Sequence, residues 1–127
     1  MFDAGIRRDE IYKGHRIIVK RIVGGGTFHG IPSHWHCGYV EIKKGSKFYG
    51  KDYREIDTEF DVHGGLTFSG ELEDVEGYFL GFDCAHFEDN PFDQGANYTL
   101  KMCKKLVNQI EVKEWKKKTL IDYTSWC

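Results

Sequence analysis

The hydrophobic pattern of this chain changes its period once, and this change restricts the fold more than any other feature of the sequence. Over residues 98–115 apolar side chains recur every three or four positions, which is typical of one face of an amphipathic helix. These side chains are Leu100, Cys103, Leu106 or Val107, and Ile110. Several shorter segments upstream alternate apolar and polar residues, as strands do. Strands followed by one helix predict an α+β fold, an antiparallel sheet packed by one C-terminal amphipathic helix.

Three segments rich in β-branched and aromatic residues are predicted to be strands. They are HRIIVKRIV at 15–23, HCGYVEI at 36–42 and GYFLGFDCAH at 77–86. The last of these is the most apolar and therefore the best candidate for a central strand. Alternation places Cys37, Tyr39 and Glu41 on one face of the second strand, opposite His36, Val40 and Ile42. In the third, Phe79, Gly81 and Asp83 share one face, and Leu80, Phe82 and Cys84 share the other.

Glycine and polar clusters predict where these strands end. The GGG at 24–26 is expected to break the chain, with a loop through 31–33. A polar arm precedes residue 15, and residues 43–56 read as a loop with a short helical turn. Residues 57–70 are expected to form a strand, a Gly-Gly break and a second strand. Asn97 is the expected N-cap of the helix, and TLIDYTSW at 119–126 is expected to return as an edge strand.

Size and composition indicate one globular domain covering residues 1–127. Apolar residues make up 40% of the 127 residues and aromatic residues 15%, which is enough to form a core and argues against disorder. No apolar run approaches the roughly 20 residues that span a bilayer. The first ten residues lack the apolar region of a secretory signal, so we expect a cytoplasmic protein without a membrane partner.

The four cysteines show no close pair. Cys37, Cys84, Cys103 and Cys127 lack any CxxC spacing. A disulfide framework and a structural zinc ribbon are therefore not expected. Cys103 is predicted to lie in the core.

Charge is distributed unevenly, although the net charge is only −2. Residues 55–100 contain twelve Asp and Glu but no Lys or Arg. An acidic centre repels a phosphate backbone, so nucleic acid is not an expected partner of the central segments.

The segment DVHGGLTFSG at 61–70 is the first candidate for a functional site. His63 could act as a ligand or a base, and Gly64 and Gly65 allow the backbone to approach a ligand closely or to bind an anion through consecutive N–H groups. Thr67 and Ser69 would share a side of the following strand. The alternative is a hairpin turn at Gly-Gly with outward Thr and Ser.

The segment GFDCAH at 81–86 is the second candidate. Asp83 follows an apolar strand, where a carboxylate is costly to bury unless it is paired or bound. His86 stands three residues further on, where a turn could bring its ring near Asp83, with Cys84 between them. Alternatively, Asp83 caps a turn and Cys84 packs in the core. We expect the two segments to meet as strand ends and to form one pocket, with His63 near Asp83 or His86.

Metal binding is not indicated by any known spacing. His34 and His36 would face the same way on an extended chain, a spacing that can chelate a metal. The chain nevertheless lacks HExxH, HxE with PCxxC, and an EF-hand loop. The GxSxG and Walker-type phosphate motifs are also missing. No metal ligand is assigned, and the sequence names no cofactor.

Four segments together resemble a known group of proteins. HCGYVEI, YGKDYREID, DVHGGLTFSG and GFDCAH, followed by a Lys-rich amphipathic helix, are similar to a family of small proteins encoded by bacteriophages and prophages. The resemblance covers roughly residues 36–112. It leaves out the segment IPSHWH, with His34 and His36, and the tail after Trp115. The family has no assigned activity. The resemblance implies a protein made in the cytosol of an infected host bacterium.

The phage setting suggests a binder of a nucleotide-derived immune signal, which would sequester its ligand and counter bacterial defence. The expected ligand-binding residues are Tyr39, His63, Gly64, Gly65, Thr67, Ser69, Asp83, Cys84 and His86. Aromatic rings such as Tyr39 would stack on a base. Phosphates would need arginines from outside the acidic centre, or from a second subunit of a homo-oligomer.

Two other functions remain open at this point. The first is a hydrolase, metal-dependent or not, acting on a nucleotide or a similar small molecule. In it His63 or His86 would be the general base, and Asp83 would orient the imidazole. The second is a module that blocks a host protein through its aromatic and acidic surface. The sequence contains no catalytic spacing that decides between a binder and an enzyme.

Overall fold

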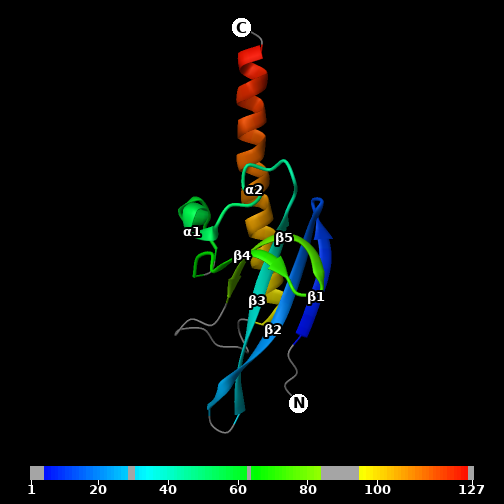
Figure 1. The fold of residues 1–127 in the computed structure, drawn as a ribbon, viewed down its shortest axis with the longest axis vertical. Coiled ribbons are helices and arrows are strands. Elements are labelled where there is room, and N and C mark those ends of the chain that lie inside the picture. Colours follow the sequence, from blue (N-terminus) through cyan, green and yellow to red (C-terminus); the bar gives the residue numbers. More distant parts are fainter. Residues whose placement is uncertain (1–4, 29–30, 63, 84–94, 126–127) are drawn as a thin grey trace.

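The chain folds into a five-stranded antiparallel sheet with one long helix packed on one of its faces (Figure 1). The computed structural model describes residues 5–28, 31–62, 64–83 and 95–125, giving the backbone alone for 25–28, 31–33 and 115–125. The strands are β1 (Gly5–Tyr12), β2 (His15–Phe28), β3 (Ile31–Ile42), β4 (Phe68–Leu72) and β5 (Val75–Asp83). The helices are α1 (Tyr53–Ile56), the 3₁₀ turn η1 (Asp57–Glu59) and α2 (Ala96–Ser125). This confirms the predicted α+β fold.

The strand order is β1-β2-β3-β5-β4, and every neighbouring pair is antiparallel. β3 is the middle strand and β5 lies inside the sheet, as its apolar sequence predicts. The face assignments of β3 and β5 are also confirmed. Val40, Ile42, Leu80 and Phe82 are buried in the core cluster that includes α2, whereas Tyr39 and Phe79 belong to a separate cluster.

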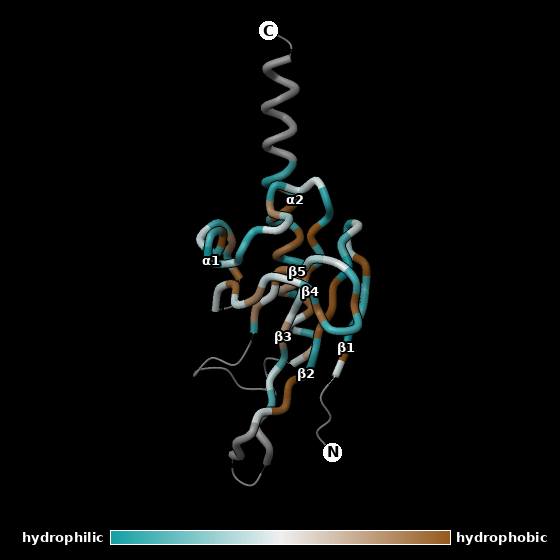
Figure 2. Tube along the Cα trace, in the orientation of Figure 1, coloured by the Kyte–Doolittle hydropathy of each residue, from teal (hydrophilic) through white to brown (hydrophobic). Residues whose placement is uncertain are grey.

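α2 covers one face of the sheet with the residues that its period predicts. Cys103, Leu106, Val107 and Ile110 are buried, and Figure 2 shows hydrophobic residues concentrated where α2 lies against the strands. The C-terminal part of α2 extends past the end of the sheet (Figure 1). No helix among the residues that the structure describes is long and apolar enough to cross a membrane.

The segment between β3 and β4 closes one end of this core. Phe48, Ile56, Phe60, Val62 and Leu66 are buried against the sheet and α2, and the rings of Phe48 and Phe60 lie 5.0 Å apart. α1 is the expected short helical turn, capped by the Asp52 side chain, which accepts from the Arg54 N–H.

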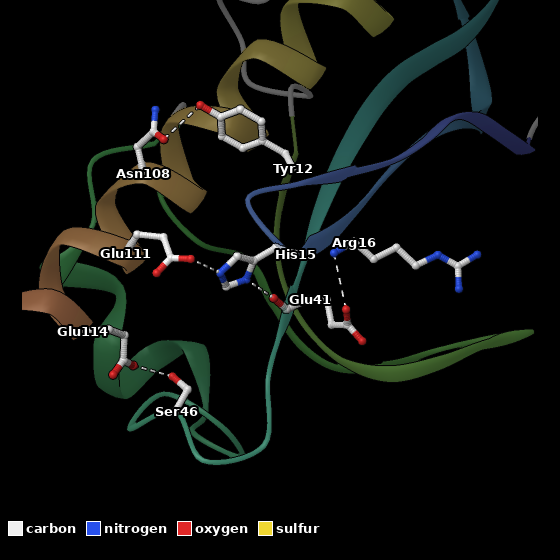
Figure 3. A network of polar contacts seen from close by, with 8 residues as sticks. All are labelled: Tyr12, His15, Arg16, Glu41, Ser46, Asn108, Glu111 and Glu114. Atoms are coloured by element: carbon white, nitrogen blue, oxygen red, sulfur yellow. Dashed lines mark hydrogen bonds and ion pairs between the residues drawn. The ribbon is translucent and has the colours of Figure 1, made fainter. Parts of the chain in front are cut away.

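Polar contacts fix α2 to the strands and to this closing segment (Figure 3). The Tyr12 hydroxyl donates to Asn108 Oδ1 at 3.1 Å, and the Ser46 hydroxyl donates to Glu114 Oε1 at 2.6 Å. His15 contacts Glu111 from the start of β2. These contacts run along more than one turn of α2, so they set the rotation of the helix about its axis as well as its position.

Several predicted boundaries in the first half of the chain are wrong. The GGG at 24–26 does not end a strand, because β2 continues to Phe28 with a shift of register between Val23 and Thr27. Residues 31–33 belong to β3 and not to a loop. The polar arm before residue 15 contains β1, an edge strand whose charged residues hide its alternation.

Three predictions in the second half are also wrong. Residues 57–59 form η1 and residues 60–62 are irregular, so the strand expected before the Gly-Gly turn is not formed by the described residues 57–62. Asn97 lies inside α2 and not at its cap, and its side chain accepts from Arg8 Nη2 at 2.8 Å. Residues 119–125 continue α2 instead of returning to the sheet.

A candidate ligand site on the outer face of the sheet

The face of the sheet opposite α2, called the outer face below, carries a row of polar side chains. Lys20 on β2 pairs with Cys37 on β3, and Cys37 pairs with Asp83 on β5. Residues directly opposite each other in antiparallel strands point to the same face. The register therefore places an ammonium, a thiol and a carboxyl group side by side across three strands.

An aromatic pair lies next to this row. Tyr39 pairs with Gly81 and Phe68 pairs with Gly81 from the other side, so the two rings meet above a glycine. Their centroids are 5.3 Å apart at 89°. A Cβ at position 81 would lie 2.7 Å from Tyr39 Cδ1. Gly81 therefore leaves the space that the Tyr39 ring occupies.

The Cys37 thiol is protonated at neutral pH. Its pKa is raised to about 11, mainly by burial and in smaller part by the nearby Asp83 charge, against lowering contributions from hydrogen bonds with Tyr39 and Trp35 and from the Lys20 charge. Because the thiolate is the nucleophilic form, Cys37 is not a nucleophile here. The pKa of Tyr39 is also raised, mainly by burial and then by Cys37, so its hydroxyl stays neutral.

Lys20 supplies a positive charge directly beside these groups. Its Nζ lies 5.9 Å from the centroid of the Tyr39 ring, within the range of a cation–π contact. The row thus joins a cation, two neutral donors and a carboxyl group to an aromatic pair. Such a set can bind a molecule that has both an aromatic ring and a charged or hydroxylated part.

The two segments singled out in the sequence do meet along the β4–β5 edge. The Thr67 N–H donates to the Gly81 carbonyl at 2.8 Å, just before β4 begins. Of the predicted ligand-binding residues, Tyr39 and Asp83 share the outer face. Ser69 points elsewhere, because its hydroxyl accepts from the Tyr53 N–H at the start of α1 at 2.9 Å.

At the Gly64–Gly65 turn, the N–H groups of Gly65 and Leu66 are hydrogen-bonded within the protein. Both glycines have positive φ, 70° and 84°, as the sequence suggested. The Gly65 N–H donates to the Val62 carbonyl at 3.0 Å, and the Leu66 N–H donates to Asp57 Oδ1 at 2.6 Å. The Asp57 carboxylate therefore occupies the place next to this turn where a bound phosphate was expected.

His63, Cys84 and His86 lie outside the described residues. The predicted contact of His63 with Asp83 or His86, and with it the acid–base pair of a hydrolase, stays a prediction. Among the residues that the structure describes, no group of three or more His, Cys, Asp or Glu side chains could hold a metal ion.

His34 and His36 face the same way, as their spacing predicts, but not toward the outer face. Both histidines are an even number of positions from Val40 along β3, so they lie on the same face as Val40, the face that carries α2. Both are buried. His36 pairs there with Arg21.

Sequence reasoning missed Lys20 and Cys37 as members of the site. The alternation of HCGYVEI already assigned Cys37 to the face of Tyr39. The alternation of residues 15–23 could likewise have assigned Lys20 to one face, but only the β2–β3 register shows that it is the same face.

Comparisons of the chain with protein-family models, with curated proteins and with solved structures found no match.

Proposed function

We propose that this protein binds a nucleotide-derived small molecule on the outer face of its sheet and does not transform it. The observation that supports this proposal is the polar row of Lys20, Cys37 and Asp83 beside the Tyr39–Phe68 aromatic pair. A base would stack on the aromatic pair, since stacking is worth about 1–3 kcal/mol per base. Lys20 would bind a phosphate, and Asp83 would accept from ribose hydroxyls.

Lys20 supplies a positive charge for phosphate binding that the acidic centre of the sequence lacks. The segment from residue 55 to residue 100 has no Lys or Arg, yet β2 brings Lys20 into the row that contains Asp83. One phosphate can therefore be bound within a single chain.

The state of the thiol disfavours covalent catalysis by Cys37. Cys37 would be a nucleophile only as a thiolate, and its raised pKa keeps it protonated. The resemblance to phage proteins supplies a setting for such a binder. In that setting it would sequester a nucleotide immune signal in the host cytosol.

The experiment combines native mass spectrometry with calorimetry. The protein is purified from bacteria that express nucleotide-based defence enzymes, and its mass is measured under native conditions. Any bound molecule is then released by denaturation and identified. The purified apoprotein is then titrated with cyclic dinucleotides, cyclic trinucleotides and mononucleotides. We expect one of these classes to bind and to be recovered unchanged. A ligand recovered in altered form would indicate a hydrolase, and no binding at millimolar concentrations would contradict the proposal.

Three variants locate the site in the same titration. Lys20→Met should weaken binding roughly tenfold and reduce its salt dependence, because one phosphate contact is lost. Tyr39→Leu should weaken binding by about 10- to 100-fold through lost stacking. Lys101→Met is the control, since Lys101 is exposed on α2, on the other side of the sheet. Equal effects of Lys20→Met and Lys101→Met would exclude the outer face.

A further inference from the structure

β1 is an edge strand with two exposed apolar residues. It pairs with β2 on one side and forms the end of the sheet on the other. Ile6 and Ile11 are 46% and 76% exposed. Both lie on the outer face, since Ile6 pairs with Lys20 and Ile11 with Arg16. An edge strand that presents apolar side chains is a template for pairing with another strand.

The sequence of β1 is complementary to itself once its irregularity is taken into account. The register shifts between Ile6 and Arg8, so Arg7 is an extra residue and the two isoleucines fall on the same face. Counted along the ladder, Asp9 is then the centre of β1. Arg8 and Glu10 lie one step to either side of it on the α2 face, and Ile6 and Ile11 lie two steps to either side on the outer face.

We propose that two copies of this chain associate through β1, antiparallel and related by a two-fold axis at Asp9. The two five-stranded sheets then form one continuous ten-stranded sheet. Ile6 of each copy packs against Ile11 of the other on the outer face. On the α2 face, Arg8 of each copy faces Glu10 of the other. Both kinds of pair occur twice because the axis repeats them.

The backbone of β1 is oriented for this pairing. β1 and β2 are joined by a two-residue turn with positive φ at Lys13 (51°) and Gly14 (81°), as in a type I′ hairpin. The residues that flank such a turn form a hydrogen-bonded pair, and bonded and non-bonded pairs alternate along the ladder. Asp9 and Ile11 consequently direct their N–H and C=O groups toward the edge.

The charges near the axis are balanced within each copy. Arg16 donates to both carboxylate oxygens of Asp9, from Nε at 3.0 Å and from Nη2 at 2.8 Å. Two Asp9 side chains that meet at the axis therefore each bring an arginine partner. Arg8 Nη2 donates to Asn97, and a guanidinium has five N–H donors, enough for Asn97 and Glu10 of the second copy together.

A charged, irregular edge usually protects a strand against pairing with other chains. In β1 the same charges select the partner. A strand without this order of charges would place uncharged groups opposite Arg8 and Glu10, which form no ion pair, or like charges, which are unfavourable, whereas a second copy places opposite charges there. A homodimer is therefore favoured over association with an unrelated strand.

Analytical ultracentrifugation of the full chain over a range of concentrations tests the proposal. We expect a concentration-dependent species of twice the chain mass of 14.8 kDa. Ile11→Lys should raise the dissociation constant at least about tenfold, because it removes both Ile6–Ile11 pairs and places charge there. Ile11 is 76% exposed, so the folded chain tolerates the change. Val112→Lys is the matched control, an exposed apolar residue on α2 that should leave the dimer intact.

A charge exchange tests the register itself. Arg8→Glu alone and Glu10→Arg alone should each weaken the dimer, since each creates two like-charge pairs. The double variant Arg8→Glu/Glu10→Arg should restore the dissociation constant to within about threefold of the wild type, because the pairs are again opposite. A monomer at every concentration up to about 1 mM, or a dimer unaffected by Ile11→Lys, would overturn the proposal. Ligand binding by the outer face is a separate measurement, so either proposal can fail alone.

Discussion

His15 Nε2 lies 3.1 Å from Glu111 Oε1, a contact that joins the first residue of β2 to the middle of α2 (Figure 3). The other ring nitrogen, Nδ1, lies 2.8 Å from the Glu41 carbonyl oxygen. A carbonyl oxygen only accepts, so Nδ1 carries a proton, and the Glu111 contact is a hydrogen bond when Nε2 or the carboxyl group also carries one. One buried ring therefore links β2, β3 and α2.

Removing this link should loosen α2. His15→Ala should lower the free energy of unfolding by about 2–3 kcal/mol, since a buried ring with two hydrogen bonds is lost. Glu111→Ala should cost about 1 kcal/mol, and the double variant should cost less than the sum of the two. Urea denaturation of the four proteins gives the coupling energy. Strict additivity would show that the contact contributes nothing. Val112→Ala, next to Glu111 and exposed, is the control.

Gly38 should be difficult to replace with a larger residue. It is buried in β3 under α2, and a Cβ there would lie 2.6 Å from Cys103 Sγ and 2.7 Å from Phe82 Cζ. Gly38→Ala should therefore destabilise the protein by about 1–3 kcal/mol through overpacking. Cys103→Ala removes the clashing sulfur and leaves only the contacts with the Phe82 ring, so the double variant should recover part of that loss. Thermal unfolding of the two single variants and the double variant measures the recovery. No recovery would mean that Phe82 alone sets the spacing.

The fold class could be predicted because the apolar residues follow two clear periods, alternation in the strands and a three- to four-residue spacing in the helix. The wrong predictions of element boundaries have identifiable causes. The face assignments of β3, β5 and α2 follow from alternation and helical spacing, and the structure confirms them. The GGG at 24–26 predicts a break because glycine weakens strands. In the structure β2 accommodates these glycines through a shift of register. β1 was missed because its charged residues lie along an edge strand, where burial imposes little pattern.

The candidate site was only partly predictable, for a geometric reason. Tyr39 and Asp83 could be assigned to faces of their own strands from the sequence. That Lys20 joins them depends on the β2–β3 and β3–β5 registers, which local sequence does not fix. Likewise, the two glycines predict a turn. The carboxylate that accepts a hydrogen bond from this turn belongs to Asp57, seven residues before Gly64, and the sequence of the turn itself does not indicate it.

The Cys37 thiol should react slowly and should make stability depend on pH above 9. Its pKa is about 11 in the folded protein against 9.0 for the free group. Below pH 9 both states keep the proton and the thiol contributes no pH dependence. Between pH 9 and 11 the unfolded chain loses the proton while the folded chain keeps it, so stability falls as pH rises.

The expected loss is about 2–3 kcal/mol, from two pKa units at about 1.4 kcal/mol each. The stability difference between the wild type and Cys37→Ala, measured by denaturation from pH 8 to pH 11, should shrink by this amount. At pH 8, iodoacetamide should modify Cys37 at least about 100-fold more slowly in the folded protein than in urea. A difference that stays constant with pH, or rapid alkylation of the folded protein, would show a thiolate at this position.

Asp57 should hold the Gly64–Gly65 turn in place. Its Oδ1 accepts from the Leu66 N–H at 2.6 Å, and a Cβ on Gly65 would lie 3.0 Å from the same oxygen. Asp57→Ala leaves the Leu66 N–H without its acceptor and should lower the free energy of unfolding by about 1.5–3 kcal/mol, the range for hydrogen bonds to charged groups. Asp57→Asn keeps an acceptor of the same shape and should lose about half as much.

Amide hydrogen exchange at Leu66 reports the contact directly. Protection should disappear in Asp57→Ala and persist in Asp57→Asn, whereas equal protection in the two variants would show that the turn is held by the Gly65–Val62 hydrogen bond instead.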